Sequence, residues 1–378
     1  MTERKKKICF FSGDITRGGG TERVAVLIAG HLAARGKYEV VFLSIVEQRK
    51  EMFFKPVREI PRHVLSRSGK WLVPGYAYLP MIPRLRRFIR QNEIDLIVDV
   101  DTILDLLTIP AIAGQKVKLI AWEHFNYNYE WPSPVYRRFR RRAFCFTARY
   151  ADHIVTLTER DAENYRKNLG RKGQIEVIYN PMEFAAEEEK VNCREKILIT
   201  VGRLTWVKGT DMLADLIPEI LCRNQKWKWY VLGDGEDRGL LEKVCKKYRL
   251  QDRLILTGNV SNVDDYLKRA SVYVMTSRAE GLPMCLLEAA ACGVTCVSFD
   301  IRTGPAEIIE DGENGFLIPA FDLRQMKEKI ELLINDNALR ETFQKNTEKT
   351  RTKFQLERIL DQWEELLGAM EGSKKQKE

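Results

Sequence analysis

Two carboxylates, Glu280 and Glu288, lie eight positions apart in the segment with the clearest chemical character. The apolar run 272–275 precedes them and predicts a buried strand, and the run 286–291 is rich in helix formers. Pro283 suits the first helical turn, where its missing N–H costs nothing. The segment therefore predicts a strand, a turn and a helix N-terminus, with Glu280 before the helix and Glu288 inside it.

The start of such a helix presents backbone amides and favours bound anions. We expect the amides of Met284, Cys285 and Leu286 to form a phosphate site. Carboxylates accept hydrogen bonds from hydroxyl groups instead. The two glutamates would therefore contact hydroxyls on either side of a bound phosphate, which is the chemistry of a nucleotide sugar.

A second charged segment, residues 202–209, follows the apolar run 197–201 and leads into a predicted helix. Its Arg203 offers a planar fork and its Lys208 a point charge, both suited to a diphosphate. A solvated loop with unrelated charges is the alternative. The nearby glutamate pair favours the diphosphate interpretation.

Two glycine-rich turns follow predicted strands. Gly18–Gly20 would let the backbone approach a ligand closely, although a tight strand-to-helix connection is the alternative. Gly233 and Gly235 resemble a nucleotide turn, but Gly239 comes one residue too late for the dinucleotide fingerprint. We interpret the second turn as structural and expect no NAD.

Three further candidates end predicted strands in the first half. Asp99 and Asp101 match a short Asp-x-Asp metal clamp, or would face an acceptor. We expect no metal, because the arginine, the lysine and the helix amides already neutralise phosphate. His124 is a site candidate at a strand end, or a histidine that merely satisfies a loop carbonyl.

Basic and aromatic residues interleave in 84–90 and 136–142. Residues 1–178 hold 32 Lys and Arg against 19 Asp and Glu, whereas residues 179–378 hold 30 against 34. These clusters suit helices lying on anionic lipid headgroups. Solvated helices are the alternative, and a nucleic-acid face lacks any accompanying recognition module.

The chain of 378 residues is long enough for two domains. No apolar run is long enough to span a membrane, and the apolar start 8–11 is too short for a signal peptide. The eight cysteines are scattered without zinc-site spacing, so we expect buried thiols in a reducing cytoplasm.

Apolar runs alternate with helical patterns in both halves, which predicts α/β domains with parallel sheets. A break near 178–181 and the acidic stretch 187–189 predict a linker. The predicted strands are 7–12, 39–46, 95–100, 117–122, 153–158, 196–202, 227–233, 253–257, 272–276 and 294–299. The predicted helices include 21–35, 79–91, 132–150, 159–169, 322–335, 338–349 and 354–367.

Taken together, these segments resemble the retaining glycosyltransferases of family 4, of the bacterial polysaccharide or lipid-linked glycan type. The resemblance rests on Gly18–Gly20, Glu123-His124, the Gly202–Gly209 segment, Gly233-Asp-Gly235, the Glu280 and Glu288 pair, and Asp311-Gly followed by Asn314-Gly-Phe316. It implies the GT-B fold, with two Rossmann-like doubly wound domains around a cleft. The implied domains are 1–178 for the acceptor and 179–353 for the nucleotide sugar, then a helix over 354–370 that crosses back and a disordered tail over 371–378.

The resemblance also implies residue roles. Arg203 and Lys208 would hold the donor diphosphate, Glu280 the transferred sugar and Glu288 the ribose hydroxyls, with Val260 near the nucleobase. His124 would lie near the reacting sugar. The expected catalytic residues are Arg203, Lys208, Glu280 and His124. The expected donor-binding residues are Gly19, Gly20, Gly202, Val260, Gly281, Leu282, Pro283, Met284, Cys285 and Glu288.

The implied activity moves a hexose or N-acetylhexosamine from a nucleotide sugar, expected to be UDP-linked, to a lipid-linked or growing polysaccharide acceptor. No metal or other cofactor is expected. The implied location is cytoplasmic, peripheral on the inner face of the cell membrane, with an anionic membrane surface as partner and no nucleic acid. An epimerase or phosphorylase of the same fold, and a non-catalytic nucleotide-sugar or RNA-binding protein, are the alternatives.

Overall fold

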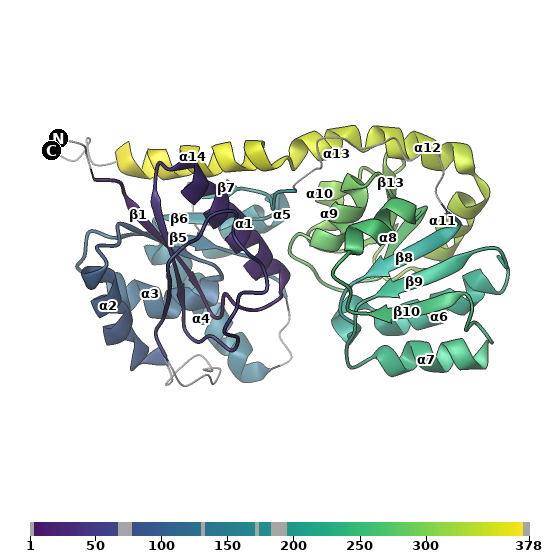
Figure 1. The fold of residues 1–378 in the computed structure, drawn as a ribbon, viewed down its shortest axis with the longest axis horizontal. Coiled ribbons are helices and arrows are strands. Elements are labelled where there is room, and N and C mark those ends of the chain that lie inside the picture. Colours follow the sequence, from purple (N-terminus) through teal and green to yellow (C-terminus); the bar gives the residue numbers. More distant parts are fainter. Residues whose placement is uncertain (1–3, 67–77, 130–132, 171–173, 183–194, 373–378) are drawn as a thin grey trace. The chain divides into compact units, whose positions relative to one another are not determined.

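The computed structural model describes residues 4–66, 78–129, 133–170, 174–182 and 195–372 (Figure 1). The chain forms two compact units. Unit 1 combines Met1–Asn180 with Glu357–Glu378, and unit 2 comprises Pro181–Leu356. The change of unit falls within the break near 178–181. The acidic stretch 187–189 lies outside the described residues.

Unit 1 contains a seven-stranded sheet in which all pairs are parallel. Its order is β3-β2-β1-β4-β5-β6-β7. The strands are β1 (Lys7–Ser12), β2 (Glu39–Ser44), β3 (Arg62–Val64), β4 (Leu96–Asp99), β5 (Lys118–Trp122), β6 (His153–Thr156) and β7 (Ile175–Val177). The five predicted strands are confirmed. The short β3 and β7 were not predicted, because three residues carry too little of an apolar pattern.

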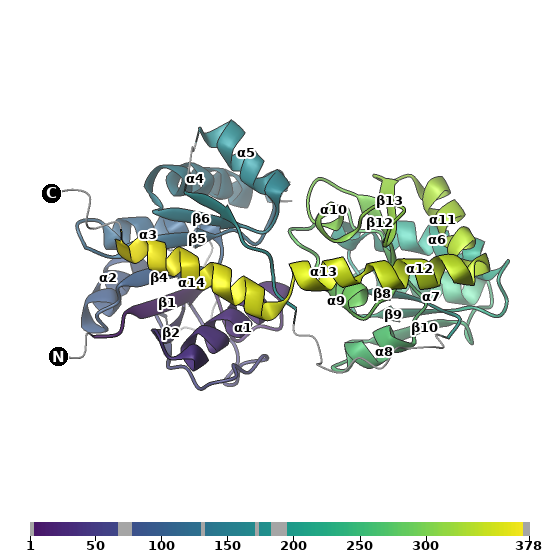
Figure 2. The ribbon, with the colours of Figure 1, turned by 90° about the horizontal axis from the view of Figure 1, so that it is seen from above.

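Helices cover both faces of this sheet. The helices are α1 (Gly20–Arg35), α2 (Met81–Gln91), α3 (Asp105–Ile112), α4 (Pro134–Tyr150), α5 (Glu159–Leu169), α14 (Leu356–Gly372) and the short η2 (Thr102–Leu104). The core of one face joins side chains of α2, α3 and α4 to the strands. Figure 2 shows α14 crossing the sheet of unit 1 from above, on the face that also carries α1.

Helix α14 docks through a buried tryptophan and an ion-pair cluster. The Trp363 side chain is fully buried, and its ring centroid is 4.8 Å from that of Trp122 at the end of β5. At the helix surface, Arg35 donates to Asp361 at 2.8 Å and also contacts Glu357. The last described helix therefore completes the first unit. It also extends to Gly372, into the predicted tail.

Unit 2 contains a six-stranded parallel sheet of order β10-β9-β8-β11-β12-β13. The strands are β8 (Ile197–Val201), β9 (Lys228–Leu232), β10 (Leu254–Gly258), β11 (Val272–Met275), β12 (Thr295–Asp300) and β13 (Gly315–Pro319). The helices are η3 (Trp206–Lys208), α6 (Thr210–Leu221), α7 (Arg238–Lys247), α8 (Val263–Arg269), α9 (Met284–Ala291), α10 (Pro305–Ile308), α11 (Leu323–Asn335), α12 (Asn337–Asn346) and α13 (Glu348–Lys353). The helix predicted over 338–349 is wrong in extent, since α12 ends before Thr347 and α13 follows it.

Both sheets have the strand order of the doubly wound fold. The direction of winding reverses between β1 and β4 in unit 1, and between β8 and β11 in unit 2. Ligands of such sheets bind beyond the carboxyl ends of the strands at this point. The loops after β8 and β11 are the ones that carry the predicted phosphate and sugar residues.

Candidate nucleotide-sugar site

The loop after β8 lies against the loop after β11. The Thr276 hydroxyl donates to the carbonyl of Lys208 at 3.1 Å, and the amide of Arg278 donates to the carbonyl of Val207 at 2.8 Å. Gly209 has φ +71, and a Cβ there would lie 2.0 Å from the carbonyl oxygen of Thr276. Only glycine permits this close approach.

Lys208 and Glu280 form the charged centre of this region. The Nζ atom of Lys208 is 2.6 Å from Oε1 of Glu280, and the side chains are 32% and 11% exposed. The loop of Glu280 is itself held, because Thr303 donates its hydroxyl to the Glu280 carbonyl at 2.6 Å. The structure thus brings together two residues to which the sequence assigns separate parts of a nucleotide sugar.

Arg203 is exposed on the loop between β8 and η3. The amide of the preceding Gly202 donates to the carbonyl of Leu232 at 2.9 Å. Gly233 has φ +128, and a Cβ there would lie 2.0 Å from the Gly202 oxygen. This contact agrees with the interpretation of Gly233 as a structural turn, because the turn supports the loop that carries Arg203.

Helix α9 begins one residue later than predicted. Pro283 has ψ 105 and is the N-cap, so the first helical residue is Met284. The placement of Pro283 inside the first turn was therefore wrong, since its extended backbone precedes the helix. Glu288 lies within α9 and is 3% exposed, and Leu282 is buried before it. The positive end of the α9 dipole faces the Glu280 loop.

The remaining donor-binding candidates lie at the same edge of the sheet. Val260 is half-buried in the loop after β10, and Gly281 and Cys285 are half-buried around the start of α9. A Cβ at Gly304 would lie 2.5 Å from the Gly281 carbonyl, so the loop after β12 packs tightly against this segment.

An arginine beside an exposed tryptophan was missed by sequence reasoning. The Arg278 guanidinium lies 4.4 Å from the ring centroid of Trp206, which is 61% exposed. Arg278 also donates to both oxygens of Asp211, at 2.7 and 2.6 Å. These contacts fasten the turn between Arg203 and Lys208. The position of Arg278, two residues before Glu280, was the signal available.

In unit 1, a buried ion cluster lies beyond the ends of β4 and β5. Arg140 of α4 is 2% exposed and contacts both Asp101 and Glu123. Glu123 also accepts hydrogen bonds from the hydroxyls of Thr102 at 2.6 Å and Tyr165 at 3.0 Å. Burial raises the pKa of Glu123 to about 7, although the charge of Arg140 opposes this shift.

The burial of Arg140 corrects its interpretation as part of a surface cluster. The side chain lies on the inward face of α4 with Ala143, Phe144 and Thr147, which are three, four and seven positions further on. This helical spacing was a signal in the sequence. Within the run of arginines, Arg140 is one for which the residues three, four and seven positions further on are all apolar or small.

His124 is buried immediately after β5. Its ring centroid is 4.3 Å from that of Trp122, and within the described part of the chain its Nε2 atom has no hydrogen-bond partner. Burial, together with the nearby charge of Arg140, lowers the pKa of His124 to about 3. The imidazole is therefore neutral at physiological pH.

The glycine turn and the Asp-x-Asp pair lie at the same edge of unit 1. Gly19 is the N-cap of α1 and Gly20 is its first residue; a Cβ at Gly19 would lie 2.3 Å from the Glu22 carboxylate. Asp99 is fully buried and accepts a hydrogen bond from Thr108 at 3.0 Å. Among the residues that the structure describes, no group of three or more His, Cys, Asp and Glu side chains could hold a metal ion.

Two protein-family models match the chain. The model described as Glycosyltransferase Family 4 matches residues 18–185, and the model described as Glycosyl transferases group 1 matches residues 182–350. The two matches are consecutive and together extend over both units.

Curated relatives match over nearly the full chain. An uncharacterized glycosyltransferase of Haemophilus influenzae is 27% identical over 96% of this chain and 100% of its own length. The amylovoran biosynthesis glycosyltransferase AmsD of Erwinia amylovora is 27% identical over 96% and 99%. An α-1,4-N-acetyl-D-galactosaminyltransferase of Campylobacter jejuni, named for a diNAcBac-PP-undecaprenol-linked glycan, is 25% identical over 97% and 99%.

Solved structures show the same fold at low identity. HepE of Anabaena in complex with UDP superimposes with a TM-score of 0.79 at 19% identity, covering 96% of this chain and 100% of that one. Sucrose-phosphate synthase of Thermosynechococcus elongatus superimposes with a TM-score of 0.80 at 18% identity, covering 97% and 100%.

Proposed function

This chain is a glycosyltransferase of family 4 with the GT-B fold, acting on nucleotide sugars, and we propose that it moves a hexose or N-acetylhexosamine from a UDP-linked donor with retention of anomeric configuration. The observation that carries the proposal is the contact between Lys208 and Glu280 beside the start of α9. A cation, a carboxylate and a helix N-terminus meet there, which suits a diphosphate next to a sugar.

The donor would lie along the carboxyl edge of the unit 2 sheet. Lys208 and Arg203 bind its diphosphate, and Glu280 accepts hydrogen bonds from the sugar. Glu288 accepts them from the ribose. Support for UDP comes from the solved complex of HepE with UDP.

In the proposed reaction the bond between the anomeric carbon and the donor phosphate breaks, and a bond to the acceptor oxygen forms on the same face. The leaving UDP takes the acceptor proton. Lys208 and Arg203 stabilise the negative charge that develops on the leaving phosphate, which is the role of preorganised electrostatics. These groups make a metal unnecessary in the proposal.

The proposed acceptor is a lipid-linked or growing polysaccharide, bound by unit 1 at the inner face of the cell membrane. The names of the Erwinia and Campylobacter relatives support this class. The excess of basic residues in 1–178 supports an anionic partner. Across the described ranges, no helix combines the length and the apolar character needed to cross a bilayer.

A donor panel with purified protein tests the function. We expect UDP release from at least one UDP-sugar, in the presence of EDTA, and a product whose anomeric configuration by NMR matches the donor. Turnover of donor into an isomeric UDP-sugar would instead identify an epimerase, and turnover that needs free phosphate would identify a phosphorylase. RNA binding without any sugar turnover would contradict the proposal.

A further inference from the structure

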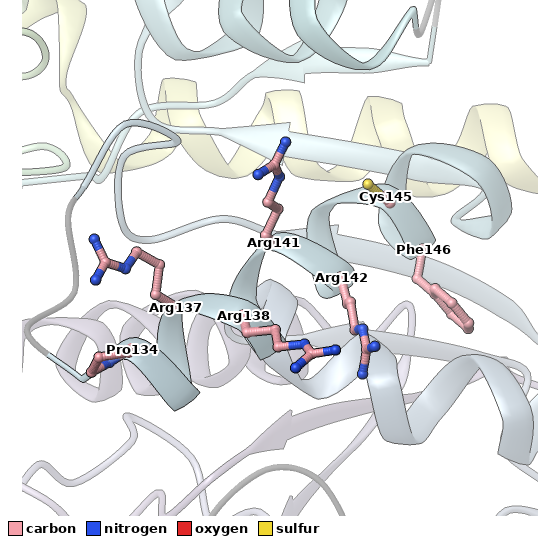
Figure 3. Close-up of a pocket in the computed structure, with 7 residues that line it drawn as sticks. All are labelled: Pro134, Arg137, Arg138, Arg141, Arg142, Cys145 and Phe146. Atoms are coloured by element: carbon pink, nitrogen blue, oxygen red, sulfur yellow. The ribbon is translucent and has the colours of Figure 1, made fainter.

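The outer face of α4 carries a hollow of about 530 Å³ that the donor chemistry does not use (Figure 3). Its lining side chains all come from this one helix: Pro134, Arg137, Arg138, Arg141, Arg142, Cys145 and Phe146. Arg137 and Arg141 are four positions apart, as are Arg138 and Arg142. The spacing places the arginines in two neighbouring rows on the exposed side of the helix, with Arg137 and Arg141 in one row and Arg138 and Arg142 in the other.

The hollow concentrates positive charge. All four lining arginines are exposed, and within the described residues none of them forms a salt bridge. By contrast, the buried Arg140 on the opposite face has two carboxylate partners. Uncompensated guanidinium groups crowded on one face repel each other and favour a multiply charged anion, above all a phosphate, which they can bind through parallel hydrogen bonds.

Exposed apolar side chains border the arginines on the same helix. Val135, Phe146 and Tyr150 are 57%, 39% and 52% exposed. The rings of Phe146 and Tyr150 contact each other at 5.6 Å between centroids. Such a border suits a ligand with both phosphate and hydrocarbon, because amphipathic surfaces of this kind bind at the boundary between headgroups and acyl chains.

The helix holds these side chains in place. On its inward face Arg140, Ala143, Phe144 and Thr147 are buried, and Arg140 is fixed by Asp101 and Glu123. The ion cluster at the ends of β4 and β5 therefore anchors the helix that carries the hollow. The backbone that carries the outward arginines therefore has a fixed position in unit 1.

We propose that the α4 hollow binds the phosphate or diphosphate of the lipid that carries the acceptor glycan, with Phe146 and Tyr150 against the hydrocarbon. This inference rests on the proposed lipid-linked acceptor and assigns its recognition to one helix. The side chains of Arg138 and Arg142 converge in the view of Figure 3, and together they provide the pair of guanidinium groups that a diphosphate needs.

Vesicle binding tests the assignment without any turnover. The full chain is mixed with phosphatidylcholine vesicles that carry a prenyl diphosphate, and with charge-matched vesicles that carry phosphatidylglycerol. We expect tighter binding to the prenyl diphosphate. The double variant Arg138→Gln with Arg142→Gln should bind these vesicles about thirtyfold more weakly and lose the preference.

The matched control removes the same charge from α2. Arg87 and Arg90 are exposed there and do not line the hollow. The double variant Arg87→Gln with Arg90→Gln should keep the preference for the prenyl diphosphate. An equal loss of preference in both double variants would mean diffuse attraction and overturn the assignment. Tighter binding to soluble inorganic diphosphate or to RNA oligomers than to the vesicles would also overturn it.

A parallel measurement of UDP release from the donor panel separates this inference from the proposed function. Vesicle preference that persists without turnover of any UDP-sugar would contradict the function and support the hollow. If a UDP-sugar is transferred onto a lipid diphosphate acceptor and the α4 double variant has an unchanged KM for that acceptor, the result would support the proposed function and contradict acceptor binding at the α4 hollow.

Discussion

The Nζ atom of Lys208 and the Oε1 atom of Glu280 are 2.6 Å apart, although 72 residues separate them in the chain. Their loops follow neighbouring strands, β8 and β11, at the point where the winding of the sheet reverses. A lysine that binds a leaving phosphate must keep a fixed position as charge develops. The contact with Glu280 gives Lys208 that position.

Lys208→Ala should lower kcat by at least about a hundredfold, because one preorganised cation is removed from the leaving phosphate. Arg203→Ala should have a similar effect. The two variants are measured by UDP release, with Lys243→Ala on the exposed face of α7 as the control. Near-normal turnover in either site variant would contradict the assigned roles.

A double-mutant cycle tests the coupling of Lys208 and Glu280. The losses in kcat/KM for Lys208→Ala and Glu280→Ala should not add, because residues in contact share their effect. Additive losses would mean that the two side chains act independently on the donor.

Glu288→Gln should reduce discrimination between the ribose and deoxyribose forms of the donor. A carboxylate that accepts from a ribose hydroxyl gains nothing from a donor that lacks the hydroxyl. We expect the ratio of kcat/KM for UDP-sugar over 2′-deoxy-UDP-sugar to fall about tenfold, the effect of weakening one charged hydrogen bond. An unchanged ratio would place the ribose elsewhere.

Arg140→Met should lower the free energy of unfolding of unit 1 by about 3–5 kcal/mol, because it leaves two carboxylates without their buried cation. Arg138→Met, on the exposed face of the same helix, should change it by less than about 0.5 kcal/mol. Urea denaturation of both variants provides the comparison. Equal effects would contradict the burial of Arg140.

His124 should make stability depend on pH. The pKa of His124 is about 3 in the folded protein and about 6.5 in the unfolded chain. As the pH falls, the imidazole is therefore protonated in the unfolded chain at a higher pH than in the folded protein. Its contribution is therefore fully present above pH 6.5 and is lost as the pH falls toward 3. Between pH 6.5 and 5 the loss is about 2 kcal/mol.

His124→Phe should remove this component, because phenylalanine has no titrating group and can still pack on Trp122. The difference in unfolding free energy between pH 6.5 and pH 5 is measured for both proteins by urea denaturation. His153→Phe, at a histidine that is partly exposed on β6, is the matched control. A pH dependence that is unchanged in His124→Phe would place the titration elsewhere.

The strands that could be predicted are those buried on both faces, because parallel strands in this position are continuous apolar runs. β1 and β11 are of this kind. The edge strands β3 and β7 are short and partly exposed, so their sequences carry no such run. Helix α3 was missed for a different reason, since it contains Pro110, which reads as a helix breaker.

The candidate site residues could be predicted from residue type and spacing, but the contacts between their side chains could not. Lys208 and Glu280 were assigned to one site because both follow strands, yet nothing in the sequence gives the ion pair between them. The helical spacing that places Arg140 on the inward face of α4 was a signal in the sequence, but its carboxylate partners Asp101 and Glu123 could not be predicted, because only tertiary packing brings them to this helix.

Helix α14 belongs to unit 1, although the ribosome synthesises the whole of unit 2 after the rest of unit 1 and before this helix. During translation the surface around Trp122 stays uncovered until Trp363 leaves the ribosome. The first unit therefore exposes the Trp122 side chain, which α14 later covers, throughout the synthesis of the second unit, when aggregation is a hazard and chaperones have a target. A chain cut short before this helix would carry that liability permanently.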